Sequence, residues 1–326
     1  MRFLFVDRIL ELVPGKSIRG IKHVTQDDFY LRRELPSCSI RSYPDVNIQD
    51  KEDEGYKFFL IPTLVGETLG QLAAWNVMFS NDFTRRPVAG IAASAKLMRY
   101  VYVGETILLE SFIDHLDETV VQYHSIARVN DEEVFLLRGA LGPLLPMQDF
   151  IDTTVVKQQF NEIYRPSTST LSQDSMQCDQ AFAIQEDEPK DVGCKKYIGP
   201  LCPAMVFDRI IACEPGKTMI AEKRITRTAA YFPDHFPLKP VLPMTVLLEC
   251  KLNLASDFLR LANFGHNYQV REMHKVKMKD FIYPGDVIIS YVSVKAHDDT
   301  KIVLNFRSAV NANLVCVLDL IMTVVV

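Results

Sequence analysis

The sequence lacks the patterns that indicate a metal site, a phosphate-binding loop or a membrane span. Its seven cysteines are scattered over 326 residues without a C-x-x-C pair, so we expect neither a zinc site nor a redox dithiol. No glycine-rich phosphate loop and no metal-ligand cluster is visible. No apolar run reaches the ~18 residues of a membrane span, and Asp7 and Arg8 interrupt the apolar amino terminus. We therefore expect a cytoplasmic protein that uses no cofactor.

Charge of one sign is also scarce. The chain has 36 basic and 41 acidic residues, a formal net charge of -5 and a pI of about 5.8. Such a balance gives no general electrostatic reason to bind nucleic acid or an anionic membrane. The length of 326 residues instead favours two globular domains with sizeable cores.

The chain contains one internal repeat. "FVDRILELVPGKSIRGIKHVT" at 5–25 recurs as "VFDRIIACEPGKTMIAEKRIT" at 206–226, 201 positions later. "AKLMRYVYVGETILLE" at 95–110 matches "VKMKDFIYPGDVIISY" at 276–291, 181 positions later, so the first copy holds about twenty extra residues between these blocks. We predict a domain at 1–145, a linker at 146–200 and a second domain at 201–326.

Both copies follow the same order of elements. Each begins with a short apolar segment, a P-G-K turn and an alternating strand, and each then contains one long apolar helix, predicted at 62–80 and 243–262. Strands are predicted after the helices, at 106–113, 120–129, 133–141, 286–294, 301–310 and 314–326. This order predicts an α+β fold in which each helix lies on one face of a curved antiparallel sheet. The join is rich in Ser, Gln and Asp and has little periodicity, which is typical of a linker.

The stretch "HFPLKPVLPMTVLLE" at 235–249 resembles the signature of the hotdog-fold 3-hydroxyacyl-[acyl-carrier-protein] dehydratases, the FabZ/FabA-like family. "FDRI", "PGK" and "YPGD" also match this family. The resemblance implies a long helix wrapped by a sheet, and a catalytic His and acid that meet across a dimer interface. A tandem chain would then be a double hotdog, a pseudo-dimer within one monomer. The signature residues fall in register at His235, Phe236, Pro237, Pro240, Pro243 and Glu249.

Departures from the family pattern occur in both copies. Leu238 and Met244 stand where the family usually has glycine, and Lys251 lies in a helix that is normally small and apolar. In the first copy, "IPTLVGETLGQLAAW" supplies Glu67 and Gln71 in the family's Glu-x-x-x-Gln spacing. No histidine occurs between residues 24 and 114, so the first copy has an acid and no base.

We therefore predict one composite site in which His235 of the second copy faces Glu67 of the first. Glu249 would belong to a second site without histidine. The spacing from proline to glutamate differs by one residue, five from Pro62 to Glu67 and six from Pro243 to Glu249, which leaves Thr68 as an alternative. We favour Glu67 because Gln71 follows it one turn later.

Dehydration of a 3-hydroxyacyl thioester needs a base for the C2 proton and an acid for the leaving C3 hydroxyl. The resemblance assigns these roles to His235 and to Glu67 or Glu249. Backbone N–H groups at the start of the helix near Pro243 would stabilise the charge on the thioester oxygen. Substrate-binding residues are expected at Phe236, Pro243, Met244 and Gln71.

The resemblance also implies an acyl carrier protein as partner. Basic residues that could form its docking rim are Arg85, Arg86, Arg99, Lys275, Lys277 and Lys279, although alternating lysines are more typical of the solvent face of a strand. Two alternatives remain open. One is a hotdog thioesterase, and the other is a catalytically silent subunit that binds acyl chains or carrier proteins.

Overall fold

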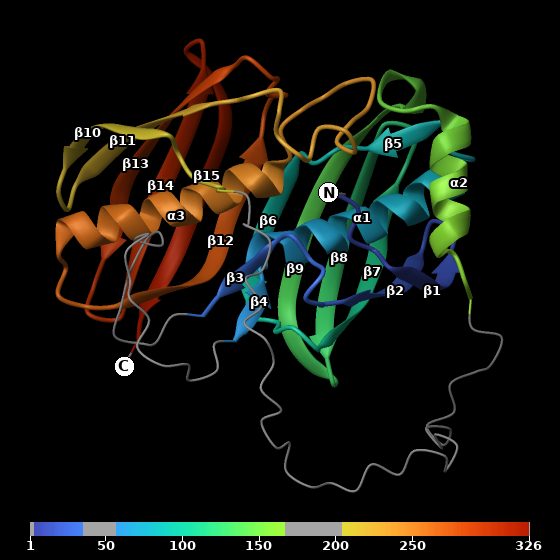
Figure 1. Cartoon of the computed structure of the whole chain (residues 1–326), viewed down its shortest axis with the longest axis horizontal. Helices are drawn as coiled ribbons and strands as arrows, with labels where there is room; N and C mark the ends of the chain where they lie inside the picture. The colour runs from blue at the N-terminus through green and yellow to red at the C-terminus, as the bar shows by residue number, and fades with distance from the viewer. Residues whose placement is uncertain (1–2, 35–56, 167–203, 326) are drawn as a thin grey trace, which may run out of the picture.

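The computed structural model describes residues 3–34, 57–166 and 204–325 (Figure 1). Its main feature is a 13-stranded antiparallel sheet with two long helices on one face. The first copy consists of β1 (Arg8–Val13), β2 (Ser17–His23), β3 (Leu31–Arg33), β4 (Phe58–Leu60), α1 (Pro62–Ser80), β5 (Arg85–Pro87), β6 (Ile91–Leu97), β7 (Thr106–Leu116), β8 (Val120–Val129), β9 (Glu132–Pro146), η1 (Met147–Asp149) and α2 (Thr153–Ile163). The second consists of β10 (Arg209–Glu214), β11 (Thr218–Arg224), α3 (Met244–Ala262), β12 (Tyr268–Met278), β13 (Val287–His297), β14 (Lys301–Val310) and β15 (Asn313–Val324).

The order of strands in the sheet is a mirror image about its centre. From one edge it runs β1-β2-β7-β8-β9-β6, and it continues β12-β15-β14-β13-β11-β10 with each strand opposite its repeat counterpart. The two halves join where β6 pairs with β12 in antiparallel register, Ala92 opposite Val276 and Ala95 opposite Met273. Because each half is one helix packed on a curved sheet, the double hotdog fold predicted from the sequence is confirmed.

The two long helices form where the apolar runs predicted them. α1 begins at Pro62, whose fixed φ suits the first helical position. α3 begins one residue later than predicted, because Pro243 is the N-cap and Met244 the first helical residue. It ends at Ala262, and its C-cap Asn263 has a left-handed φ of 49° that closes the last turn. No helix within the described ranges combines the length and apolar character that a membrane span requires.

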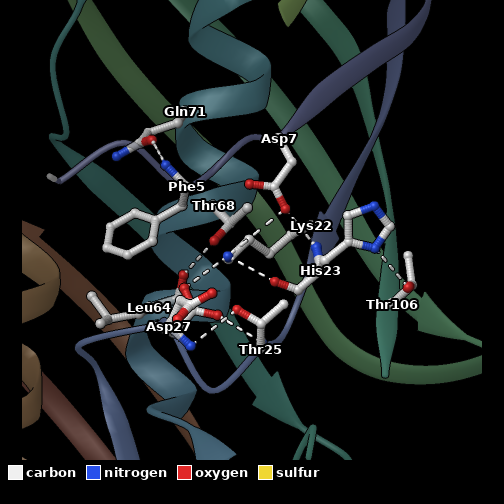
Figure 2. A network of polar contacts seen from close by, with 11 residues as sticks. Phe5, Asp7, Lys22, His23, Thr25, Asp27, Leu64, Thr68, Gln71 and Thr106 are labelled. Carbon is white, nitrogen blue, oxygen red and sulfur yellow. Dashed lines mark hydrogen bonds and ion pairs between the residues drawn. The ribbon is translucent and has the colours of Figure 1, made fainter. Parts of the chain in front are cut away.

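The repeated Asp of each copy accepts a hydrogen bond from the backbone at the end of the second strand, from the His23 amide to Asp7 at 2.6 Å (Figure 2) and from the Arg224 amide to Asp208 at 2.5 Å. Lys22 is 6% exposed, and its ammonium donates to Asp28 at 2.8 Å and to the carbonyl of His23 at 2.8 Å, with Asp7 at 3.8 Å. In the second copy, Lys223 donates to the carbonyl of Val206 at 2.8 Å. The repeated aspartate therefore ties the segment before the first strand to the end of the second strand in both copies, and in the first copy Asp28 also neutralises the buried Lys22.

The predicted linker is wrong for part of 146–200. Residues 147–149 form η1 and 153–163 form α2, while 167–200 lie outside the described residues. Asp152 caps α2 by accepting a hydrogen bond from the Thr154 amide at 2.7 Å. Phe160 is 3% exposed and packs 5.9 Å from Trp75, measured between ring centroids. This polar stretch of sequence therefore contains a helix whose apolar face packs against α1.

Candidate active site

The two long helices exchange hydrogen bonds across the centre of the molecule. The Thr245 hydroxyl of α3 donates to Glu67 of α1 at 2.7 Å, and the Thr63 hydroxyl of α1 donates to Glu249 of α3 at 2.9 Å. Each threonine is the second residue of its helix and each glutamate the sixth. The two pairs are therefore equivalent positions related by the repeat.

This geometry explains the one-residue difference in spacing. Counting starts at Pro62 in α1 and at Met244 in α3, which places Glu67 and Glu249 182 positions apart at equivalent sites. Thr68 does not take this position, because its hydroxyl donates to the Leu64 carbonyl at 2.7 Å and is 0% exposed.

Glu67 is held by side chains from both copies. Besides the bond from Thr245, it accepts a hydrogen bond from the Gln71 amide at 3.0 Å. Gln71 in turn donates to the Phe3 carbonyl at 3.1 Å and accepts from the Phe5 amide at 3.0 Å, the latter visible in Figure 2. The amino-terminal segment thus fixes Gln71, which fixes the carboxyl group of Glu67.

His235 is oriented by a backbone carbonyl. Its Nδ1 lies 2.8 Å from the Val241 carbonyl oxygen, which can only accept, so Nδ1 carries the proton. Nε2 of the neutral ring is then left as the acceptor. Burial lowers the pKa of His235 below its usual value, and the nearby charge of Glu67 opposes this effect only in part. The imidazole is therefore neutral at neutral pH.

His235 and Glu67 line one cavity of about 190 Å³. Gln71, Phe236 and Met244 also line it, whereas Pro243 and Glu249 do not. The structure thus brings together most of the predicted site residues and separates His235 from Glu249. Met244 is the first residue of α3, where amide groups have no acceptor within the helix, and it also lines the cavity.

Small residues on α1 leave the space that forms the cavity. Gly66, Gly70, Ala73 and Ala74 lie on its lining, at the helical spacing of one face. At the equivalent positions of α3, Leu248 and Leu252 replace the two glycines. The void beside Leu252 measures only about 10 Å³. The cavity of about 190 Å³ therefore lies next to α1, whereas the void that the described residues leave beside Leu252 is small.

Glu249, the second glutamate, forms an ion pair with Arg32. Glu249 is 1% exposed, and its carboxylate lies 2.6 Å from the Arg32 guanidinium. Arg32 also donates to Asn253 at 3.1 Å. Where the first site has a neutral histidine, this one has a permanent positive charge, so Glu249 is held as one half of an ion pair.

Sequence reasoning missed Thr245, although a threonine at the second position of both helices was a usable signal. It placed Arg86 among six possible rim residues, and in the described part of the chain Arg86 alone of these six lines the cavity. Arg99 instead pairs with Glu105 at 3.0 Å and with Glu132 at 2.7 Å.

Comparison with protein families finds a match within the second copy. A family model described as ApeI-like, ApeI dehydratase, matches residues 212–317. The 3-hydroxyacyl-[acyl-carrier-protein] dehydratase FabZ of Psychrobacter arcticus is 30% identical over 100 residues, 29% of this chain and 68% of the relative. FabZ of Coxiella burnetii is 32% identical over 110 residues, 32% of this chain and 77% of the relative. Among solved structures, the tesB protein of Mycobacterium avium subs paratuberculosis covers 97% of this chain and 96% of its own at 12% identity, with a TM-score of 0.49.

Proposed function

Because the chain belongs to the hotdog-fold dehydratase family of ApeI and FabZ, we propose that it removes water from 3-hydroxyacyl thioesters to give trans-2-enoyl thioesters. The substrate would be carried by an acyl carrier protein, as the names of its FabZ relatives state for them. The observation that carries this proposal is the meeting of His235 and Glu67, from different copies, on one apolar cavity.

In the proposed reaction His235 acts as the base. Its unprotonated Nε2 takes the C2 proton, the C2–H electrons form the C2–C3 double bond, and the C3–O bond breaks. Glu67, which must enter the reaction in its protonated form, gives its proton to the departing hydroxyl, which leaves as water. Return of one proton from His235 to Glu67 restores both groups for the next turnover.

Charge that develops on the thioester oxygen needs a donor that is already in place. The Met244 amide at the start of α3 supplies one, and the positive end of the helix dipole strengthens it. The side chain of Met244 also lines the cavity, where the family usually has glycine, and so borders the space left for the substrate. The chemistry itself uses only the backbone N–H of this residue.

A single site per chain follows from the asymmetry of the copies. The neutral His235 and the small residues of α1 serve the first site, whereas in the second Arg32 pairs with Glu249 and Leu252 borders only a small void. We propose that Glu249 takes no part in the reaction and that its ion pair is structural.

Mass spectrometry of the carrier-bound acyl group tests the proposal. The purified chain is incubated with a 3-hydroxyacyl-carrier protein and, separately, with the enoyl form, because the equilibrium can favour hydration. We expect loss or gain of one water, abolished by His235→Ala and retained by His115→Ala, a control at an exposed histidine. Absence of turnover in both directions over several chain lengths, with the acyl chain still bound, would point to the silent acyl-binding subunit instead.

A further inference from the structure

Arg86 on β5 places a cation in the wall of the acyl cavity. Its guanidinium carbon lies 3.7 Å from the ring centroid of Phe236 and 5.6 Å from that of Phe150. The ring of His235 stacks on Phe236 with centroids 4.0 Å apart. One ring face cannot hold both groups at these distances, so Phe236 separates the guanidinium from the imidazole. Arg86 therefore lies next to the reacting centre without touching the base.

The guanidinium group of Arg86 has a hydrogen-bond donor without an acceptor. Its Nε is buried and has no hydrogen-bond partner among the described residues. The neighbouring carboxylate of Glu67 already accepts from Thr245 and Gln71. Burial lowers the pKa of Arg86 to about 9, against the opposing charge of Glu67, so the side chain remains a cation at neutral pH. A buried donor without an acceptor is unfavourable unless a ligand completes it.

A plain alkyl chain would leave this donor unpaired. About half of the residues that line the cavity are alanine, glycine, valine or leucine, which suit a hydrocarbon, and Arg86 is the one arginine or lysine among its lining residues in the described part of the chain. We infer that Arg86 is a specificity-determining residue that binds an oxygen acceptor, a carbonyl or carboxylate, on the acyl chain. The cavity then selects oxygen-bearing acyl thioesters over alkyl ones. This inference rests on the proposed function, which assigns the cavity to the acyl chain.

The single tryptophan of the chain makes a binding test possible without turnover. Trp75 is 7% exposed and lines the same cavity, so its fluorescence reports occupancy. The full chain is titrated with three non-hydrolysable pantetheine thioethers of equal chain length, ending in a methyl, a methyl ketone or a carboxylate. Arg86→Met removes the charge, Arg86→Lys keeps it, and Arg85→Met is the control at the exposed neighbouring arginine.

We expect the wild-type chain and Arg85→Met to bind the two oxygen-bearing ligands at least tenfold more tightly than the methyl ligand. Arg86→Met should lose this preference while binding the methyl ligand as well as before or better, and Arg86→Lys should keep part of it. Equal affinities in the wild type would overturn the inference. So would an equal loss for all three ligands in Arg86→Met, which would place Arg86 against the pantetheine arm or in loop packing.

The two proposals fail separately in this design. A chain that shows the preference and never exchanges water with a thioester would overturn the dehydratase and leave the role of Arg86 standing. A chain that dehydrates thioesters with no preference would overturn the role of Arg86 alone.

Discussion

Substitutions that add side-chain volume at Gly70 should change ligand binding and the stability of the fold independently of each other. This glycine lies within α1, and a Cβ built there meets only the Tyr123 hydroxyl, at 3.7 Å, an ordinary van der Waals distance. A glycine inside a helix costs about 0.5–1 kcal/mol relative to alanine. Gly70→Ala should therefore raise the free energy of unfolding by about that amount, or Tm by roughly 2 °C.

Gly70→Leu should affect the longest acyl chains. It repeats the arrangement of α3, where Leu252 stands at the equivalent position, and adds three carbons beyond Cβ. Each buried methylene that the substrate loses costs about 0.8 kcal/mol, so three amount to about 2.4 kcal/mol, or about 50-fold in KM. Short chains that do not reach this point should be unaffected. Steady-state kinetics over a series of chain lengths measures the difference.

Gly104→Ala is the matched control. This glycine has a φ of 96° and no neighbour within 4 Å of an added Cβ, so alanine there should lower stability and leave the chain-length profile unchanged. The reasoning would be refuted if Gly70→Leu folded normally and turned over long chains with the wild-type KM. In that case the acyl chain would not lie along α1.

Three further outcomes follow from buried charges. Arg32→Met should lower the free energy of unfolding by roughly 3 kcal/mol, because it leaves Glu249 without its ion-pair partner. In the Glu249→Gln background the same change should cost much less, which a double-mutant cycle followed by urea denaturation measures. Lys251 is 0% exposed and donates to the Cys316 thiol at 3.0 Å, so Lys251→Met should stabilise the chain by about 1–2 kcal/mol in the same assay. The pKa of His235 is lower in the folded chain than in the unfolded chain, so the unfolded chain binds the proton more readily. The free energy of unfolding should therefore fall as the pH drops below about 6.5. Urea titrations at pH 7 and pH 5.5 should show a smaller fall in His235→Gln than in the wild type.

The repeat within the sequence was sufficient to predict the architecture. Two similar copies imply two similar folds, and the apolar runs at 62–80 and 243–262 correspond to α1 and α3 within one residue. Helix α2 was missed because its surroundings are polar. Its own signals are short, an aspartate N-cap at Asp152 followed by Val156 and Phe160 one turn apart.

The asymmetry of the two sites depends on a register that the sequence left open. Gly66 and Gly70 can be compared with Leu248 and Leu252 only once the helix starts are known, because the proline-to-glutamate spacings differ by one. The ion pair between Arg32 and Glu249 joins residues more than 200 positions apart, and no local sequence pattern predicts it. Long-range packing therefore decides which copy can hold a ligand.

The most direct test of the composite site compares the two glutamates. Dehydration of one 3-hydroxyacyl-carrier protein is measured with Glu67→Gln and Glu249→Gln, after circular dichroism has shown that both fold. The account predicts that Glu67→Gln lowers kcat by roughly 10²-fold or more, the range for loss of a general acid, while Glu249→Gln stays within a few-fold of the wild type. Full activity in Glu67→Gln with loss of activity in Glu249→Gln would contradict it.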